Sequence, residues 1–341
     1  MTTKKNLGFG KYFSPRMVQT TWTLAKGWAP LEITDVAPIA LHPAASVLQY
    51  SQTIFEGMKA FRGEDGKIRL FRADFNAARF QKSASRVCLP EVPKDIFLKA
   101  TYDAVSTNRD SIPSDEGEAL YLRPTLMGTE GFLGVRPSHE AMFFVICSPV
   151  GNYYEKGQSG LKILVETEDS RAALGGIGDA KAGANYAASL RAAERAKSKG
   201  FDQVLWMDSA THQWIEEVGT MNIFFRIGDT VVTPALNGSI LNGATRTCVL
   251  EILRDKGIRV EERPVSIEEI FTASENGQLK EAFGTGTAAV ISSVQEFALS
   301  SGGRRAVLPD NGEIATAMRK TILDIQYGRT ADKFGWCTIV N

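Results

Sequence analysis

The hydrophobic positions of the chain change their spacing many times along its length, and each spacing predicts a type of element. Apolar and polar side chains alternate over residues 31–36, which is typical of a strand with one buried face. Residues 141–147 are all apolar, and this favours a fully buried strand. We predict further strands or extended segments at residues 68–71, 119–124, 161–167, 203–208, 215–225 and 231–234.

In other segments the apolar residues recur every three or four positions, which predicts amphipathic helices. Gly200 and Gly257 follow two of these segments and favour the end of a helix there. The sequence Ser-Ile-Glu-Glu at residues 266–269 is a capping box that opens another helix. The main predicted helices are residues 74–87, 93–106, 186–199, 245–256 and 313–327. Because hairpins interrupt an irregular alternation of strands and helices, the pattern favours an α+β fold over a doubly wound parallel sheet.

One stretch has the composition of a linker. Residues 151–160 read GNYYEKGQSG, which is rich in glycine and polar residues. A chain of 341 residues is long enough for about two domains, each with its own core. We therefore expect a small N-terminal domain at residues 1–150, an interdomain linker at 151–160 and a larger domain at 161–341.

The charge balance narrows the classes of function. Lys+Arg and Asp+Glu both number 39, so the formal net charge is zero and no overall field would attract nucleic acid or an anionic membrane. The longest apolar run, residues 141–147, is too short to cross a bilayer. The N-terminus lacks the apolar core of a signal peptide. We expect a cytoplasmic protein that binds neither nucleic acid nor membranes.

Cysteines and histidines are too few and too scattered to suggest a metal or redox centre. The four cysteines form no CxxC pair, and their wide spacing suits reduced thiols. The three histidines form no H-x-x-x-H pair, so we expect no metal site and no histidine-based triad. The short Gly-x-Gly runs at residues 176–178 and 284–286 do not complete G-x-G-x-x-G, which argues against a dinucleotide-binding fold.

A glycine-rich stretch at residues 175–186, GGIGDAKAGANY, contains a single lysine, Lys181. Glycine allows close approach of the backbone to a ligand, and small neighbours leave the lysine room to reach a planar group. A desolvated lysine there could act as an amine nucleophile toward a carbonyl. The alternative is a flexible surface loop with one solvated lysine, and the stretch alone favours that alternative.

Other residues could complete a site around this amine. Glu217 begins a predicted strand, and residues 243–246 begin a helix, whose free N–H groups attract anions. Residues 286–288 form another small-residue bend, and Arg79 could pair with a phosphate. An amine, a carboxylate and a phosphate cradle are what pyridoxal phosphate requires. Spacing does not establish this site, because each part is common in ordinary proteins.

Longer motifs carry a resemblance. Residues 217–224 (EVGTMNIF), 231–233 (VVT) and 241–246 (LNGATR) are similar to the signature of class IV, or fold type IV, pyridoxal-phosphate aminotransferases. Ala244 departs from that signature, which has a larger aliphatic residue there. The chain more specifically resembles the branched-chain amino acid aminotransferases from about residue 8 to 340. The motifs that carry this second resemblance are residues 55–61 (FEGMKAF), 119–124 (ALYLRP), 178–186 (GDAKAGANY), 203–206 (QVLW) and 324–328 (DIQYG).

The resemblance implies a two-domain fold with a small N-terminal α/β domain and a larger C-terminal domain that contains a pseudo-barrel. It also implies that Lys181 is the catalytic residue and binds pyridoxal 5′-phosphate covalently, while Glu217 pairs with the pyridine nitrogen. The remaining cofactor-binding residues that it implies are Arg79, Tyr186, Thr220, Ala244, Thr245 and Thr287. Strand alternation lets only one of Glu216 and Glu217 face the ring, and only the resemblance selects Glu217. In the same way, only the resemblance selects Arg79 over Arg86.

The same resemblance implies a substrate site and an assembly. The substrate pocket would be formed by Tyr50, Phe55, Tyr121, Arg123, Tyr153, Thr287 and Ala288, with Leu133 and Val135 closing it from the other subunit of a homodimer. Arg123 would bind the side-chain carboxylate of glutamate. The expected partners are small molecules, namely branched-chain amino acids, glutamate and 2-keto acids.

The implied activity is reversible transfer of the amino group between L-leucine, L-isoleucine or L-valine and 2-oxoglutarate. A D-amino acid aminotransferase or an aminodeoxychorismate lyase of the same fold is the nearer alternative, and a non-catalytic binding protein is the more distant one. Mammalian relatives carry a redox CxxC after the Gly-Thr-Gly-Thr bend, but this chain has Ala289 and Ser292 there. We therefore expect no thiol switch of that kind.

Overall fold

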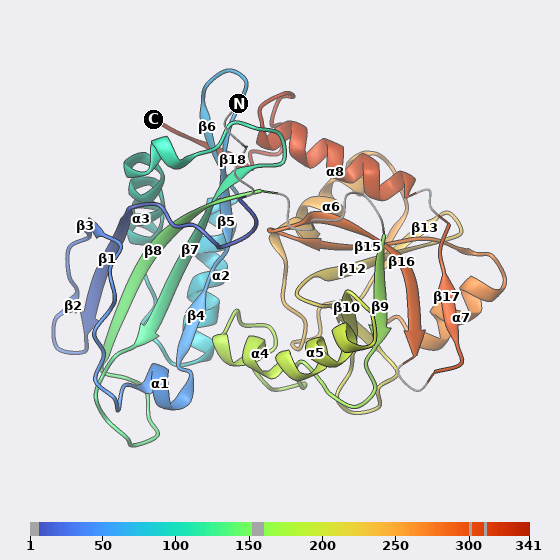
Figure 1. Cartoon of the computed structure of the whole chain (residues 1–341), viewed down its shortest axis with the longest axis horizontal. Coiled ribbons are helices and arrows are strands. Elements are labelled where there is room, and N and C mark those ends of the chain that lie inside the picture. The colour runs from blue at the N-terminus through green and yellow to red at the C-terminus, as the bar shows by residue number, and fades with distance from the viewer. Residues whose placement is uncertain (1–6, 152–159, 300–301, 310–311) are drawn as a thin grey trace. The chain divides into compact units, whose positions relative to one another are not determined.

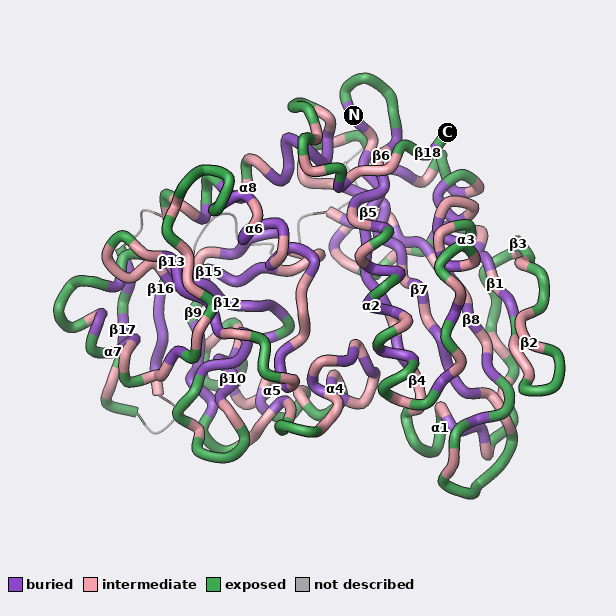
Figure 2. The backbone as a smooth tube through the Cα atoms, turned by 180° about the vertical axis from the view of Figure 1, so that it is seen from behind, coloured by how far each residue is buried: buried purple, intermediate pink, exposed green. Residues whose placement is uncertain are grey.

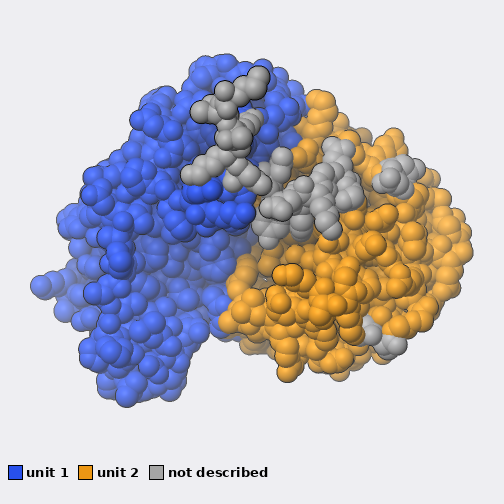
Figure 3. Space-filling model, viewed as in Figure 1, with its two compact units in different colours: residues 1–155, 180–184, 323–341 blue, residues 156–179, 185–322 orange. Residues whose placement is uncertain are grey.

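The structure, a computed structural model, describes residues 7–151, 160–299, 302–309 and 312–341. The chain divides into two compact units, which are coloured separately in Figure 3. Unit 1 comprises Met1–Glu155, Ala180–Ala184 and Leu323–Asn341, and unit 2 comprises Lys156–Asp179 and Asn185–Ile322. No helix within the described ranges is long and apolar enough to cross a membrane.

Unit 1 is built on a nine-stranded sheet in which every described strand pair is antiparallel (Figure 1). The strand order is β18-β6-β5-β7-β8-β1-β2, with β3 paired to β1 and β4 paired to β7. Its strands are β1 (Arg16–Thr23), β2 (Gly27–Trp28), β3 (Glu32–Asp35), β4 (Thr53–Phe55), β5 (Met58–Arg62), β6 (Ile68–Phe71), β7 (Ala119–Gly128), β8 (Glu140–Val150) and β18 (Cys337–Val340).

Two helices, α2 (Ala73–Arg86) and α3 (Lys94–Thr107), pack together and against this sheet (Figure 2). Three fully buried rings join the layers: the Phe80 centroid lies 5.1 Å from that of Phe97 and 5.5 Å from that of Phe143. Burying such rings provides the main drive for docking the helices. The unit also contains α1 (Ser46–Tyr50) and a short 3-10 helix, η1 (Arg109–Ser111).

Unit 2 is built on a second nine-stranded sheet, which mixes parallel and antiparallel pairs. The strand order is β11-β10-β9-β16-β15-β12-β13-β14, with β17 paired to β16. Strand β9 runs parallel to β10 and β16, and β13 runs parallel to β14. Its strands are β9 (Leu161–Val165), β10 (Gln203–Met207), β11 (Ile215–Val218), β12 (Asn222–Ile227), β13 (Thr230–Thr233), β14 (Val260–Glu262), β15 (Leu279–Gly286), β16 (Val290–Leu299) and β17 (Arg305–Val307).

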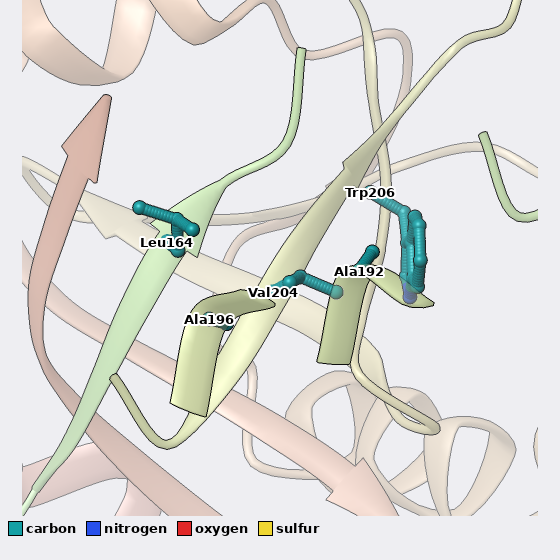
Figure 4. Packing of buried hydrophobic residues seen from close by; sticks show 5 residues of the cluster. All are labelled: Leu164, Ala192, Ala196, Val204 and Trp206. Atoms are coloured by element: carbon teal, nitrogen blue, oxygen red, sulfur yellow. The ribbon is translucent and has the colours of Figure 1, made fainter. Parts of the chain in front are cut away.

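Helices cover this sheet at several points. Helix α5 (Leu190–Ser198) packs on β10 through the small side chains of Ala192 and Ala196, which meet Leu164, Val204 and Trp206 (Figure 4). The other helices are α4 (Gly183–Ala188), α6 (Ala244–Asp255), α7 (Ile267–Glu275) and α8 (Glu313–Gln326). The mixture of helices with two largely antiparallel sheets confirms the predicted α+β class.

Two predicted elements are divided in the structure. The helix predicted at residues 186–199 is two helices, because the Ser189 hydroxyl and N–H both bond to the Tyr186 carbonyl, at 2.7 and 3.2 Å, and interrupt the helical ladder. The extended segment predicted at residues 215–225 is divided into β11 and β12. Val218 and Met221 exchange backbone hydrogen bonds of 2.9 Å around a tight turn, in which Gly219 has a φ of 56°.

The compact units follow chain contacts rather than the order of the sequence. Residues 323–341 group with unit 1 because β18 pairs with β6, although the predicted larger domain runs to residue 341. Residues 180–184 also group with unit 1, since Ala182 forms an isolated bridge with Ile54. Most of the predicted linker at 151–160 lies outside the described residues. The domain boundaries proposed from the sequence stay a prediction.

Candidate functional site

Lys181 is held against the edge of β4 in unit 1. Its carbonyl accepts the N–H of Phe55 at 3.0 Å, and its own N–H donates to the Ser83 hydroxyl at 2.9 Å. The Lys181 amine nitrogen lies 4.8 Å from the centroid of the Phe55 ring. The lysine backbone is therefore tied on two sides and its side chain runs over an aromatic face, which is not the flexible, solvated loop that the alternative reading required.

Helix α2 presents Ser83 and Arg79, which are four residues apart and therefore lie on one face. The Arg79 guanidinium donates from Nε and Nη2 to the two oxygens of the Glu56 carboxylate, each at 2.7 Å. Glu56 is fully buried and Arg79 is 8% exposed, so this pair is desolvated. Arg86, the other arginine considered for the phosphate, is exposed at the end of the helix.

Tyr121 and Arg123 lie two residues apart on β7, on the same side of the strand. Arg123 donates from Nη2 to the Tyr121 hydroxyl at 3.0 Å, and its guanidinium carbon lies 4.5 Å from the Phe55 ring centroid. The Tyr121 hydroxyl sits against Gly57, where an added Cβ would come within 2.1 Å of it. Lys181 and Arg123 thus both lie over the Phe55 ring, and Tyr121 joins them through its bond to Arg123.

A second group of predicted substrate residues lies at the surface of unit 1. The hydroxyl of Tyr50, the last residue of α1, donates to the Leu133 carbonyl. Leu133 and Val135 are 63% and 87% exposed, which leaves an apolar loop tip in solvent. Tyr153 lies outside the described residues.

Glu217 lies on β11 in unit 2 and is only 4% exposed. Its Oε1 accepts the Leu241 N–H at 2.7 Å and lies 3.2 Å from Nη2 of Arg171. Such donors stabilise the charged form of a carboxylate. Sequence reasoning missed Arg171, because it belongs to none of the motifs and no spacing marks it.

Glu216, the neighbour of Glu217, is equally buried at 3% exposure. Its Oε1 accepts the Ser239 hydroxyl, and Oε2 has no hydrogen-bond partner among the residues that the structure describes. Burial raises the pKa of the Glu216 carboxyl, and the hydroxyl of Ser239 and the charge of Arg171 offset only part of that effect. Strand alternation alone could not decide which of the two carboxylates faces the ring, and in the structure they have different hydrogen-bond partners.

The start of α6 has the features of an anion site. Its first turn holds the buried residues Ala244 and Thr245, contains no acidic side chain, and has no side-chain cap. Arg246 is turned away, since its guanidinium bonds to Glu262 at 2.8 Å. Asn222 supports the preceding loop: its amide donates to the Leu241 carbonyl at 2.9 Å, and a Cβ added to Gly243 would come within 2.1 Å of its Oδ1. The first turn of α6 therefore contains no carboxylate of its own that would compete for its N–H groups.

Two predicted cofactor residues lie at the same end of neighbouring strands in unit 2. Asn222 pairs with Thr285 across β12 and β15, which brings the turn of Thr220 near the turn that contains Thr287 and Ala288. A Cβ added to Gly286 would lie 3.9 Å from the Thr220 carbonyl. Tyr186, on α4, belongs to the same unit. Within the described ranges, no group of three or more His, Cys, Asp or Glu residues could hold a metal ion.

The chain is similar to proteins of known families over nearly its whole length. A family model described as amino-transferase class IV matches residues 53–297. The branched-chain-amino-acid aminotransferase 2 of Bacillus subtilis is 45% identical over 334 residues, which cover 98% of this chain and 92% of that protein. A probable branched-chain-amino-acid aminotransferase of Streptomyces coelicolor is 44% identical and covers 97% of this chain and 92% of its own.

Solved structures show the same fold. The branched-chain aminotransferase of Thermoproteus uzoniensis with norvaline has a TM-score of 0.78 and 25% identity, and the likeness covers 95% of this chain and 100% of that one. The Escherichia coli branched-chain amino acid aminotransferase also has a TM-score of 0.78, at 23% identity, over 94% of this chain and 99% of its own. These likenesses confirm the fold type that the motifs implied.

Proposed function

The chain belongs to the class IV aminotransferase family, and we propose that it transfers the amino group between branched-chain L-amino acids and 2-oxoglutarate. The observation that carries the substrate proposal is the 45% identity, over 98% of the chain, to a branched-chain-amino-acid aminotransferase. The other relatives of similar identity have the same kind of name. The substrates would be leucine, isoleucine and valine.

Pyridoxal phosphate is the cofactor of this family of enzymes, and it supplies an aldehyde that captures amines and a protonated ring that withdraws electrons. Residues of the chain suit three groups of this cofactor: the aldehyde, the ring nitrogen and the phosphate. Lys181 offers an amine held on a fixed backbone, and Glu217 offers a buried carboxylate for the ring nitrogen. The acid-free first turn of α6, with Ala244 and Thr245, suits the phosphate. We assign Arg79, Thr220 and Thr287 to the phosphate as well, and Tyr186 to the ring oxygen.

The covalent chain limits the distance between Lys181 and the backbone near Glu217. The Gly178 carbonyl accepts Nη2 of Arg171 at 3.2 Å, and the same nitrogen lies 3.2 Å from Glu217. Only three residues of chain lead from Gly178 to Lys181, and three residues span about 11 Å when fully extended. Chain length alone therefore limits how far the Lys181 backbone can lie from the Arg171 guanidinium.

The chain's own groups would perform the proton chemistry and the binding. The Lys181 amine would take the proton from the substrate α-carbon and return it to the cofactor carbon that had carried the aldehyde. Glu217 keeps its negative charge beside the ring nitrogen and so holds the proton there. The cofactor stays on the enzyme between two half-reactions, which predicts ping-pong kinetics.

Substrate selection would come from the aromatic residues of unit 1. The rings of Tyr50, Phe55 and Tyr121, with Tyr153 and Ala288, would form an apolar pocket that accepts branched aliphatic side chains. Such a pocket discriminates one methylene only modestly, so several aliphatic amino acids should react. We assign Arg123 to the second carboxylate of glutamate, because its Nε is buried without a hydrogen-bond partner among the described residues.

We also propose a homodimer. The apolar loop tip with Leu133 and Val135 is highly exposed in a single chain, and burial against a second copy would remove that cost. The pocket would then be closed by the tip from the partner subunit. Four cysteines without a disulfide, two of them buried, suit a reducing compartment, and we place the protein in the cytoplasm.

The experiment compares Lys181→Ala with Lys197→Ala, an exposed lysine on α5 that serves as the matched control. We expect purified wild-type and Lys197→Ala protein to show a visible cofactor band that changes with L-leucine. Lys181→Ala should lose that band and reduce turnover by about a thousandfold or more. Unchanged turnover in Lys181→Ala would refute the mechanism.

A substrate comparison separates the proposal from its alternatives of the same fold. We expect L-leucine to react much faster than D-alanine or aminodeoxychorismate. A preference for either of the latter would keep the fold and overturn the substrate assignment. Colourless protein without any borohydride-trapped adduct would instead favour the non-catalytic binding protein.

A further inference from the structure

Two neighbouring carboxylates, Glu216 and Glu217, are both buried on β11, at 3% and 4% exposure. Two negative charges side by side inside a protein repel one another and lose their hydration. Such a pair is stable when one member holds a proton or when a cation lies beside it. The groups around the pair indicate which carboxylate is stabilised as an anion.

Arg171 is a cation that lies beside this pair. Its Nη2 lies 3.2 Å from Oε1 of Glu217, and its charge also acts on Glu216. Arg171 is itself 91% buried, being 9% exposed, so its charge is poorly screened by water. The single guanidinium thus compensates one of the two carboxylates.

The partners of the two carboxylates differ in kind. Glu217 accepts a backbone N–H and faces a guanidinium, and both stabilise an anion. Oε1 of Glu216 accepts the Ser239 hydroxyl, Oε2 has no hydrogen-bond partner among the described residues, and burial favours the protonated form of this carboxyl. The surroundings therefore favour the proton on Glu216 and the negative charge on Glu217.

Arg171 also fastens the backbone on either side of this pair. The same Nη2 donates to the carbonyls of Gly178, at 3.2 Å, and Ser239. These two backbones are in close contact, since a Cβ added to Gly178 would come within 2.2 Å of the Ser239 oxygen. Gly178 lies three residues before Lys181, so the guanidinium clamps the loop that leads to the lysine.

The loop that carries Arg171 is anchored by a second ion pair. Buried Glu166 accepts Nη2 of Arg195 at 2.6 Å and the backbone N–H groups of Glu168 and Asp169 at 2.8 and 3.0 Å. These contacts fix the start of the loop two residues before Arg171. A guanidinium on a fixed loop is preorganised, so little conformational entropy is lost when it binds its partners.

We propose that Arg171 is a positioning residue for the transamination proposed above: it orients Glu217, stabilises its negative charge and clamps the loop at Gly178. It rests on the proposed function, because Glu217 acts there on the ring nitrogen. Without Arg171, Glu217 loses the cation that stabilises its negative charge, and the Gly178 carbonyl loses its hydrogen bond to the guanidinium. Glu217 would then hold a proton at the ring nitrogen less firmly, and the electron withdrawal that a protonated ring supplies would weaken.

The test replaces Arg171 with Met and with Lys, and uses Arg226→Met as the matched control. Arg226 also pairs with a buried carboxylate in unit 2, that of Glu281 at 3.2 Å, but it touches neither Glu216 nor Glu217 in the described structure. Two quantities are measured: the dissociation constant of pyridoxal phosphate for the apoprotein, and the single-turnover rate with saturating L-leucine. Circular dichroism checks that each variant is folded.

We expect Arg171→Met to weaken cofactor binding about tenfold or more and to lower the limiting single-turnover rate by a similar or larger factor. The leucine concentration that gives half the limiting rate should change by less than about threefold, since Arg171 is not assigned to the substrate. Arg171→Lys should recover part of both losses, because it restores the charge without the planar fork. Arg226→Met should change neither quantity by more than about twofold.

Equal effects in Arg171→Met and Arg226→Met would overturn the proposal, as would unchanged cofactor affinity and rate in folded Arg171→Met. If Arg171→Met does not fold, Arg171→Lys provides the test. Wild-type cofactor affinity and a wild-type single-turnover rate in Arg171→Lys would show that the planar guanidinium is not needed, and would refute the proposal. Failure of the proposed function is distinct, since wild-type protein would then show no single-turnover reaction with leucine at all.

Discussion

The two halves of the candidate site compensate buried charge in opposite ways. In unit 1, the carboxylate of Glu56 pairs with the Arg79 guanidinium, and the amine of Lys181 lies over the Phe55 ring. Around Glu217 in unit 2, two carboxylates share the single guanidinium of Arg171. The named groups of unit 1 carry an excess of positive charge, and those of unit 2 an excess of negative charge.

This difference matches the two kinds of charge that the proposed ligands carry. Carboxylates and phosphates are anions and suit the cations of unit 1; within unit 2, the start of α6 suits an anion and Glu217 suits a protonated ring nitrogen. Buried positive charge would thus bind the anionic groups of the ligands, and buried negative charge would bind the protonated ring nitrogen. Removing charges on each side tests this division.

The largest effect is expected from neutralising the charged carboxylate of unit 2. Glu217→Gln keeps an oxygen for the Leu241 N–H but removes the negative charge. We expect turnover of leucine to fall by about a hundredfold to a thousandfold, because a preorganised charge is lost where charge develops. Steady-state kinetics measures this effect.

The matched control for that variant is Glu281→Gln. Glu281 is also buried in unit 2, where it accepts the N–H groups of Ile314 and Ala315 at the start of α8. Its replacement should lower stability through the lost cap and leave the cofactor-dependent rate nearly unchanged. A comparable loss of turnover in both variants would contradict the special role of Glu217.

An intermediate effect, on stability, is expected from the paired charges of unit 1. Glu56→Gln removes the charge opposite Arg79 and leaves a buried cation without its counterion. Breaking a buried ion pair in this way costs about 3–5 kcal/mol in the free energy of unfolding. Denaturant unfolding of the apoprotein measures the loss.

An exposed pair of the same unit provides the control. Asp103→Asn breaks the pair between Lys99 and Asp103 on α3, which is 2.7 Å long and largely solvated. We expect this change to cost about 1 kcal/mol or less. If Glu56→Gln costs no more than Asp103→Asn, the pairing in unit 1 is not the tight compensation described above.

The smallest effect is expected from Glu216 and depends on pH. Because burial raises the folded-state pKa of Glu216, the folded protein prefers the protonated form, and stability falls as pH rises through that raised value. Glu216→Gln removes this fall. The variant should therefore be more stable than wild type above that pH, on the order of 1 kcal/mol, and equal to it below the ordinary carboxyl range.

Thermal unfolding across that pH range checks this prediction. A pH dependence that is the same in wild type and Glu216→Gln would mean that Glu216 is charged in the folded protein. The two carboxylates of unit 2 would then both be anions, and the proton assignment on which the comparison depends would be wrong.

Much of the local structure could be predicted from the chain. Apolar patterns located strands β8 and β10 and helices α2 and α3, because burial imposes a fixed period on apolar residues; β3 is a strand as predicted, but it has no buried face, and Ile33 is 44% exposed. Ser266 caps α7 as its capping box predicts, with its hydroxyl accepting the Glu269 N–H at 3.0 Å. The break at Ser189 was missed, since a serine inside a helix gives no clear sign of which carbonyl its hydroxyl bonds.

The sequence by itself determined the family, the order of elements and the identity of Lys181 and Glu217 as candidates, because motifs and periodicity are local properties of a chain. Only the tertiary structure decided that Arg171 faces Glu217, that Glu56 faces Arg79, and that Ser83 holds the lysine backbone. These partners are 46, 23 and 98 residues apart, and no local pattern relates them. Long-range charge pairing depends on how strands and helices pack, and packing is set by the whole fold.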